Sequence, residues 1–221
     1  MKILFVDPPF HRFMGFYRFL YPIGLAYMAA VLKEKGHQVM IYDAEHSEET
    51  RSMVWSEASG NFHKYHEALK DGSNPVWEEF NNILKQYNPD MVGITMLSVK
   101  GPSAARIAAL TKAFNKEIIV VVGADHPTVF PAGTLNDPNI DSVVRGEGER
   151  TIEELTGCLQ EKRDPGEVDG ISCKKNGEII HNKNRELIKD LDTLPQSHKV
   201  TKDFRINRRN RITLIGIPYS V

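Results

Sequence analysis

Four short segments of this chain combine glycine, proline and small hydroxyl side chains in patterns that suit ligand binding by backbone amides. They are residues 7–22, 95–101, 123–128 and 145–149. Glycine lets a backbone amide approach a bound group closely, and a helix that begins after such a loop donates amides to phosphate or carboxamide oxygens. Turns between strands and helices are rich in glycine and proline in any case, so these segments show where a site could lie.

The sequence does not fit the motifs of three common phosphate-related sites. The sequence Gly146-Glu147-Gly148 lacks the third glycine of a dinucleotide fingerprint, and its carboxylate would repel a pyrophosphate. No Gly-x-x-x-x-Gly-Lys-Ser/Thr sequence is present, which excludes a P-loop. A phospho-receiver site needs clustered acids after its first strand, where this chain has Asp7 followed by two prolines.

Histidines and aromatic residues offer further candidates. His63 and His66 are three residues apart, a spacing that suits either two metal ligands or, more commonly, a polar surface helix. Glu147 and Glu149 could form a pair of acids, although Glu149 better suits the N-terminus of a helix. An aromatic-rich segment could cover a flat ring or pack against another domain. Its members are Phe10, Phe13, Phe16, Tyr17, Phe19 and Tyr21.

Bulk composition is that of a soluble globular protein. Of 221 residues, 41% are apolar and 26% charged, and the net charge of −1 gives no electrostatic support for binding nucleic acid or anionic membranes. The longest apolar runs are too short to span a bilayer. Cys158 and Cys173 are too few to hold an iron–sulfur cluster or a structural zinc, and we expect them to be reduced thiols in a cytoplasmic protein.

Apolar runs rich in β-branched residues alternate with helical patterns. We predict strands at residues 3–6, 39–42, 91–94, 118–122 and 141–144, and helices at 23–35, 76–86, 103–115 and 149–160. Because the runs lack polar alternation, the strands should form a parallel sheet with helices on both faces, a doubly wound α/β fold. Ligands of such sheets bind beyond the carboxyl ends of the strands.

The chain divides into two parts. Residues 1–165 form the predicted Rossmann-like domain, with a polar insertion at 44–75 that we expect to be partly helical and to form a flap over the site. Residues 166–221 contain a predicted β-hairpin with an Asn-Gly turn, then linker sequence. In that part, residues 205–211 carry four arginines and are expected to be a solvated linker, and residues 212–215 look like a strand whose exposed edge favours dimerisation.

Several motifs occur in a specific order along nearly the whole chain. They are Asp7-Pro8-Pro9, residues 21–27 (Tyr-Pro-Ile-Gly-Leu-Ala-Tyr), Asn88-Pro89-Asp90 before a strand ending at Thr95, residues 122–128 (Val-Gly-Ala-Asp-His-Pro-Thr), residues 145–149 (Arg-Gly-Glu-Gly-Glu), Asp169-Gly170-Ile171 and residues 191–195 (Leu-Asp-Thr-Leu-Pro). Together they resemble the N-terminal cobalamin-binding domain of cobalamin-dependent radical S-adenosylmethionine (radical SAM) enzymes. That group includes the family of anaerobic magnesium-protoporphyrin IX monomethyl ester cyclase.

The resemblance implies a flavodoxin-like fold with five parallel strands. The corrin ring of cobalamin would lie over the carboxyl edge of the sheet, and its nucleotide tail would enter a groove lined by small residues. The implied hydrogen-bonding set is Ser98, Thr128 and the backbone of residues 95–98. The implied cofactor-binding residues are Asp7, Pro8, Pro9, Thr95, Met96, Leu97, Ser98, Gly123, Ala124, Asp125, His126, Thr128, Gly146, Glu147 and Gly148.

Two departures from the family pattern concern the cobalamin site. Ala124 stands where the family has a second glycine, and it would be strained at a positive φ. The Asp-x-His-x-x-Gly motif that supplies a cobalt ligand in related methyltransferases is missing, because Pro9 occupies the histidine position. His11 and His126 are then candidates for the metal ligand, and the preferred alternative for His126 is a hydrogen bond that fixes its loop.

The last six residues resemble the start of the Cys-x-x-x-Cys-x-x-Cys loop of radical SAM enzymes, with Ile217 and Val221 at the first two cysteine positions. We therefore expect a cobalamin-binding module without an iron–sulfur cluster or catalysis of its own, working with a radical SAM domain or a partner chain. Two alternatives stay open. One is a degenerate interaction domain that has lost its cofactor, and the other is a flavodoxin-like protein that binds another planar cofactor.

Overall fold

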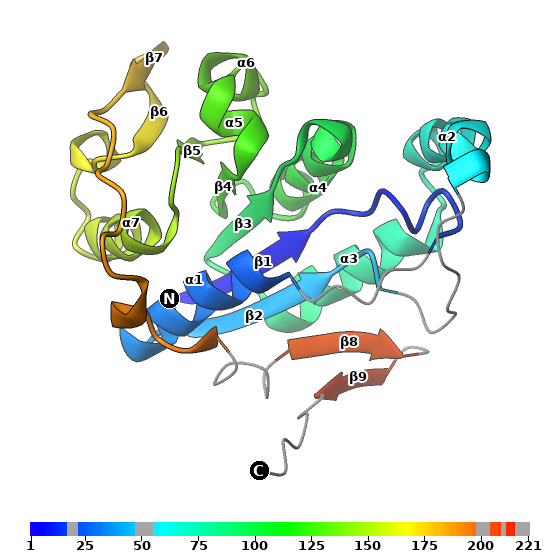
Figure 1. The fold of residues 1–221 in the computed structure, drawn as a ribbon, viewed down its shortest axis with the longest axis horizontal. Coiled ribbons are helices and arrows are strands. Elements are labelled where there is room, and N and C mark those ends of the chain that lie inside the picture. The colour runs from blue at the N-terminus through cyan, green and yellow to red at the C-terminus, as the bar shows by residue number, and fades with distance from the viewer. Residues whose placement is uncertain (17–21, 47–54, 198–203, 209–210, 215–221) are drawn as a thin grey trace.

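The structure is a computed structural model that describes residues 1–16, 22–46 and 55–197 and the backbone of residues 204–208 and 211–214. Within these residues, nine strands form one sheet in the order β7-β6-β5-β4-β3-β1-β2-β8-β9 (Figure 1). Its centre consists of β1 (Lys2–Asp7), β2 (Gln38–Asp43), β3 (Met91–Thr95), β4 (Ile119–Gly123) and β5 (Ser142–Val144). All four pairings among them are parallel. The order 2-1-3-4-5 is that of flavodoxin-like folds, which confirms the predicted fold class.

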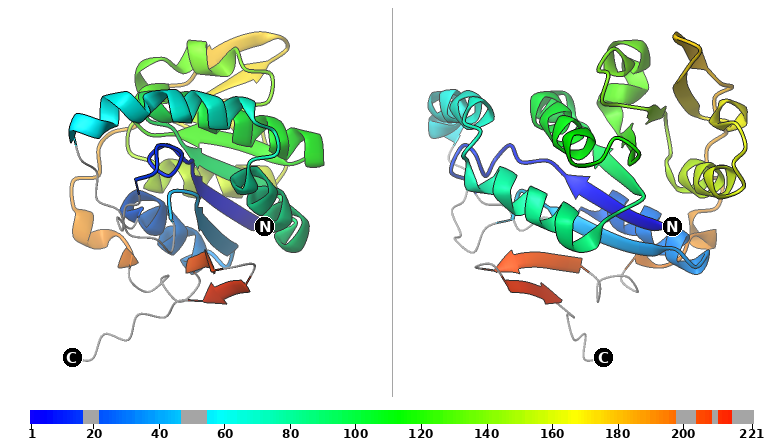
Figure 2. Two further views of the ribbon diagram at one scale, coloured as in Figure 1. Left: turned by 90° about the vertical axis from the view of Figure 1, so that its right-hand side faces the viewer. Right: turned by 180° about the vertical axis from the view of Figure 1, so that it is seen from behind.

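Helices cover both faces of the sheet (Figure 2). Helices α1 (Ile23–Glu34) and α7 (Glu149–Gln160) contact each other on one face, and α3 (Pro75–Tyr87) and α4 (Gly101–Phe114) lie together on the other. Side chains of β1 divide accordingly, with Ile3 and Phe5 in the core beneath α1 and α7 and Leu4 and Val6 in the opposite core. The remaining helices are α2 (Trp55–Lys70), α5 (Asp125–Val129), α6 (Pro131–Leu135) and the 3-10 turns η1 (Ser98–Lys100), η2 (Pro165–Glu167) and η3 (Leu191–Thr193).

The predicted hairpin is present as β6 (Ile171–Lys175) and β7 (Glu178–His181). Asn176 and Gly177 join its strands at φ 53° and 85°, the left-handed conformation that a two-residue Asn-Gly turn requires. Strand β6 also pairs antiparallel with β5, so the hairpin extends the sheet. The proposed boundary between residues 165 and 166 stays a prediction.

Two further strands follow the hairpin in sequence. Strand β8 (Phe204–Arg208) pairs parallel with β2, and β9 (Arg211–Leu214) pairs antiparallel with β8. The prediction of a solvated linker over residues 205–211 was therefore wrong for residues 205–208 and 211, which lie in strands. Sheet pairing uses backbone groups, so an edge strand tolerates charged side chains. Dimerisation through the β9 edge stays a prediction, and the cysteine-like motif at 216–221 lies outside the described residues.

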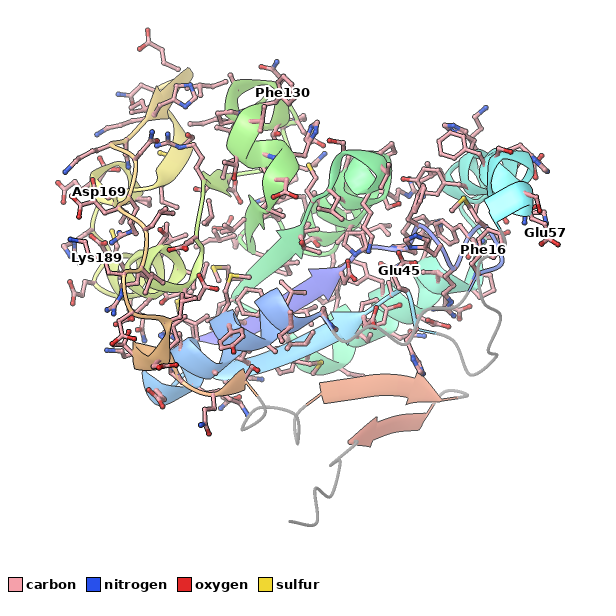
Figure 3. The ribbon with its side chains drawn as sticks, viewed as in Figure 1. Phe16, Glu45, Glu57, Phe130, Asp169 and Lys189 are labelled. Carbon is pink, nitrogen blue, oxygen red and sulfur yellow. The ribbon has the colours of Figure 1, made fainter. Side chains whose placement is uncertain are left out.

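The insertion at 44–75 contains α2, as predicted, while residues 47–54 lie outside the described part of the chain. Phe10, Phe13 and Phe16 are buried beside it. The ring of Phe10 packs with Tyr65 of α2 at a centroid distance of 4.9 Å, and that of Phe13 packs with Trp77 of α3 at 5.2 Å. Figure 3 shows Phe16 in the loop beside α2. These three side chains are part of the hydrophobic core. The predictions that they cover a flat ring or pack against another domain were therefore wrong for them. Tyr17, Phe19 and Tyr21 lie outside the described residues.

No helix among the described residues combines the length and the apolar character needed to cross a membrane.

Candidate functional site

A cavity of about 240 Å³ lies between the sheet and helices α1 and α7, towards the carboxyl ends of the strands. Phe5, Gly93 and Val121 contribute from the sheet, and Met28 and Ile152 contribute from the two helices. The complete lining is Phe5, Gly24, Leu25, Met28, Gly93, Ile94, Thr95, Val121, Val122, Gly123, Ala124, Val144, Gly146, Glu147, Gly148, Glu149 and Ile152. The lining is mainly apolar with a few polar groups, as is typical of small-molecule sites.

Two glycines of the cavity lining are packed closely against neighbouring side chains. A Cβ atom on Gly93 would lie 2.6 Å from the Phe5 ring, and one on Gly148 would lie 2.9 Å from Met28 Sδ. Both distances are shorter than any ordinary contact, so side chains at these positions would displace the aromatic floor or the α1 wall. The cavity therefore presents backbone to a ligand where other residues would present bulk.

The loops after β4 and β5 meet at the rim of the cavity through Thr128. Its Oγ1 donates to the carbonyl of Ala124 over 2.8 Å and accepts from the backbone N–H of Gly146 over 3.0 Å. Gly146 has a φ of +69°, a conformation that glycine adopts without strain. Thr128 thus links two loops that line the cavity, and its hydrogen bond to a cofactor stays a prediction.

Ala124 occupies a backbone conformation suited to glycine, with φ 93° and ψ −164°. Such a conformation costs a residue with a Cβ about 1–3 kcal/mol. We expect Ala124→Gly to stabilise the chain by about 1 kcal/mol after the greater entropy of glycine in the unfolded state is subtracted. Urea unfolding measures this, with Ala132→Gly in α6 as a control that should destabilise. Loss of stability in Ala124→Gly would show that the strain is absent.

Six of the fifteen predicted cofactor-binding residues line the cavity. They are Thr95, Gly123, Ala124, Gly146, Glu147 and Gly148. Met96 is buried in the core on the opposite face of the sheet, and Leu97 is 40% exposed at the carboxyl edge. Asp125 and Thr128 belong to α5 beside the cavity, whereas Asp7, Pro8 and Pro9 lie at the end of β1 and the start of its loop. Their contacts with a cofactor stay predictions.

The two candidate cobalt ligands have different surroundings. His126 Nδ1 forms a hydrogen bond of 3.0 Å with Ser98 Oγ, which joins the loops after β3 and β4. This is the loop-fixing hydrogen bond that we preferred for His126. Its ring also lies 5.6 Å from that of Phe130, which Figure 3 shows on the short α5–α6 segment. His11 Nδ1 instead bonds Glu45 Oε1 over 2.9 Å. Cobalt ligation by either residue stays a prediction.

A buried ion cluster lies at the ends of β1 and β2. Lys100 Nζ is 2.5 Å from Asp7 Oδ1 and 3.0 Å from Glu45 Oε1, and only 5% of the lysine is exposed. Asp43, at the end of β2, accepts from the backbone N–H of Glu45 over 3.0 Å. With His11, the cluster contains three carboxylates and two basic side chains. No local pattern in the sequence indicates this cluster, because its members come from three separate segments of the chain.

The pKa values of two of these carboxyl groups are shifted in opposite directions. Burial and the nearby charge of Asp7 raise the pKa of Asp43 to about 7, so this carboxyl keeps its proton close to neutrality. Burial also disfavours the charge on Glu45, but the hydrogen bond from His11 and the Lys100 ammonium outweigh it and lower the pKa of Glu45 to about 2. Glu45 is therefore ionised at neutral pH, whereas Asp43 is protonated at mildly acidic pH.

The paired glutamates at the start of α7 have separate surroundings. Glu147 Oε2 accepts a hydrogen bond of 2.6 Å from the backbone N–H of Ile188, which fastens the segment after the hairpin beside the cavity. Glu149 lies in the first turn of α7, where a carboxylate stabilises the helix N-terminus, as predicted. Both line the cavity, so the rim carries acidic groups as well as backbone amides.

Predictions of a metal on α2 find no support in the described residues. His63 Nδ1 bonds the carbonyl of Gly60 over 2.6 Å, and His66 packs edge-on against Phe62. Within the described residues, no group of three or more metal-binding side chains is suitably placed. Cys158 and Cys173 are both buried and free, and burial raises the pKa of each thiol.

Comparisons with known proteins agree with this geometry. A family model described as the B12 binding domain matches residues 16–156. An uncharacterized methyltransferase of Pyrococcus horikoshii is 33% identical over 200 residues, which cover 88% of this chain and 37% of that protein. The anaerobic magnesium-protoporphyrin IX monomethyl ester cyclase of Synechocystis is 28% identical over 196 residues, or 87% and 34% of the two chains. This chain thus spans about a third of the length of these relatives.

Solved structures show the same fold. OxsB, a cobalamin-dependent S-adenosylmethionine radical enzyme solved with aqua-cobalamin bound, matches with a TM-score of 0.61 and 19% identity over 84% of this chain and 22% of its own. The radical S-adenosylmethionine methyltransferase TsrM of Kitasatospora setae, solved with cobalamin and a [4Fe-4S] cluster, matches with a TM-score of 0.58 and 18% identity over 82% and 30%. With the family model matching well over half of its residues, this chain belongs to the B12-binding domain family.

Proposed function

We propose that this chain is a cobalamin-binding module that holds the nucleotide tail of cobalamin in the cavity between the sheet and helices α1 and α7. The observation that carries the proposal is the set of glycines in the cavity lining, among them Gly93 inside β3 and Gly148 before α7, which present backbone where a side chain would otherwise stand. A site that must admit a flat heterocycle between packed layers needs backbone at those points.

The size of the cavity supports a division of the ligand. Its volume of about 240 Å³ lies below the roughly 300–1,000 Å³ typical of pockets that enclose a whole drug-sized ligand. A corrin ring is too large for this cavity. We therefore propose that the nucleotide tail lies inside the cavity and the ring lies over the carboxyl edge of the sheet. Exposed apolar side chains at that edge, Leu97 and Val99 after β3 and Val129 and Phe130 after β4, would face the ring.

Bound cobalamin would supply a cobalt centre able to carry a methyl group, which suits the methyltransferases and cyclases among the relatives. This chain's residues would bind and orient the cofactor, while a radical SAM domain or a partner chain would hold the substrate. The two cysteines of the sequence are buried and have raised thiol pKa values, so we propose that neither ligates an iron–sulfur cluster.

A titration of the purified chain with hydroxocobalamin, followed by absorbance and gel filtration, tests the proposal. We expect a red protein that co-elutes with corrinoid and a spectrum in which the nucleotide base no longer ligates cobalt. Failure to retain cobalamin at roughly tens of micromolar, an affinity weaker than about −6 kcal/mol, would contradict it. Such a result would favour a domain that has lost its cofactor, and binding of FMN in its place would favour another planar cofactor.

A further inference from the structure

The loop after β1 is held in place by side chains from other segments. Glu45 accepts hydrogen bonds from the backbone N–H groups of Phe10 and Arg12, each over 3.0 Å. The carbonyl of Pro9 accepts from Ser103 Oγ of α4 over 2.5 Å, and Ser103 Oγ also bonds the hydroxyl of Tyr65 in α2 over 2.8 Å. Residues 9–12 therefore depend on a buried polar network for their position.

Lys100 joins this network to the loop after β3. Its ammonium contacts Asp7 at the end of β1 and Glu45 beyond the end of β2, over 2.5 Å and 3.0 Å. Figure 3 shows Glu45 beside the ends of these strands. Lys100 is the last residue of η1, two positions after Ser98, and it precedes the first residue of α4. The buried Lys100 ammonium thus connects the loop after β1 with the loop after β3. These two loops flank the point in the sheet where the strand order reverses.

A purely stabilising role explains this arrangement poorly. Removing charges from water costs about as much as their pairing returns, and buried ion pairs are often replaced by apolar residues without loss of stability. A charged contact with several hydrogen bonds instead holds the segments around a site in one fixed arrangement. The Lys100 ammonium and its two carboxylate partners, Asp7 and Glu45, hold two loops that begin at the carboxyl edge of the sheet, where the proposed cofactor would lie.

We propose that Lys100 is a positioning residue for cofactor binding, which sets the loop after β1 relative to the loop after β3 without touching the cofactor. This inference rests on the proposed function. Lys112 of α4 offers a matched control, because its Nζ binds Asp141 Oδ2 over 2.6 Å and the carbonyl of Ile118 over 2.7 Å at the end of the helix remote from Lys100. Both lysines are largely shielded from solvent, with side chains 6% and 16% exposed.

The test compares Lys100→Met with Lys112→Met by cobalamin titration, urea unfolding and hydrogen exchange without cobalamin. We expect Lys100→Met to raise the dissociation constant about tenfold or more and Lys112→Met to change it less than about twofold, because only the first loosens loops at the site. Exchange at the amides of Phe10 and Arg12 should quicken in Lys100→Met alone. Ser103→Ala, a milder change in the same network, should show the same pattern if Lys100→Met does not fold.

Equal affinity for cobalamin in folded Lys100→Met and the unchanged chain would overturn the inference, as would an equal loss in Lys112→Met. Unaltered exchange at Phe10 and Arg12 would overturn it as well. If the unchanged chain binds no cobalamin, the proposed function fails by itself. The exchange comparison still reports whether Lys100 positions the loop, so the two failures are distinguishable.

Discussion

Gly148→Leu should abolish cobalamin binding while the chain stays folded. Gly148 lies at φ −87° and ψ −23°, a conformation that leucine adopts readily, so the backbone need not change. The added side chain would start 2.9 Å from Met28 Sδ and 3.7 Å from Val144 Cγ1, both in the cavity lining. We expect it to fill the space reserved for the nucleotide tail and to raise the dissociation constant at least about 100-fold, near 3 kcal/mol.

Gly157→Leu is the matched control for this experiment. Gly157 lies two turns further along the same helix, and a Cβ atom there meets no atom within 4 Å. Leucine is a better helix former than glycine by up to about 1 kcal/mol, so this variant should be as stable as the unchanged chain or more so. Undiminished cobalamin affinity in Gly148→Leu, with the control also unchanged, would show that the tail binds elsewhere.

Asp43→Asn should stabilise the chain strongly at pH 8 and hardly at all at pH 4. In the folded chain the pKa of Asp43 is raised to about 7, mainly by burial and then by Asp7, whereas in the unfolded chain it lies near 3.8. The folded state therefore binds the proton more tightly, and its stability falls as pH rises from about 4 to 7. Above pH 7 the full cost of the buried charge is present, at most about 4 kcal/mol.

Asparagine removes that cost because it does not titrate, and its side-chain oxygen can still accept from the backbone N–H of Glu45, as Asp43 does over 3.0 Å. Urea unfolding of both proteins between pH 4 and 8 measures the difference. The two curves should converge at low pH and separate as pH rises. A difference that is constant with pH would mean that folding does not raise the pKa of Asp43.

Glu45 should have the opposite pH dependence. Its pKa is lowered to about 2 from an ordinary value of 4.5, so its ionised form contributes stability above pH 4.5 that is lost as pH falls towards 2. Glu45→Gln should therefore destabilise the chain at pH 6 and have a smaller effect near pH 2. A loss of stability equal at both pH values would show that the Glu45 charge contributes nothing.

The central sheet could be predicted because buried parallel strands are nearly continuous apolar runs. Residues 39–42 and 118–122 are of this kind and became β2 and β4 within one residue or so. Short elements gave no such signal. Helices α5 and α6 have five residues each, and prolines at 127 and 131 interrupt any helical pattern. Strand β8 was missed because its arginine-rich sequence has the composition of a linker.

The rim of the site could be predicted and its walls could not. Thr95, Gly123 and Gly146 were found because ligands of parallel sheets bind at the strand ends, where glycine loops are visible in the sequence. Met28 and Ile152 look like ordinary core positions of amphipathic helices, and nothing local distinguishes a residue that packs on a neighbour from one that lines a cavity. Gly93 was the available signal, because a glycine inside an apolar strand marks a close approach of other groups.

Parallel titrations with cobalamin and with cobinamide, a corrinoid without the nucleotide tail, test the central claim most directly. If the cavity between the sheet and helices α1 and α7 holds the tail, cobinamide should bind at least about tenfold more weakly than cobalamin. The same titrations on Gly148→Leu should remove that difference. Equal binding of the two corrinoids by the unchanged chain would contradict the account, because the cavity would then contribute nothing to recognition.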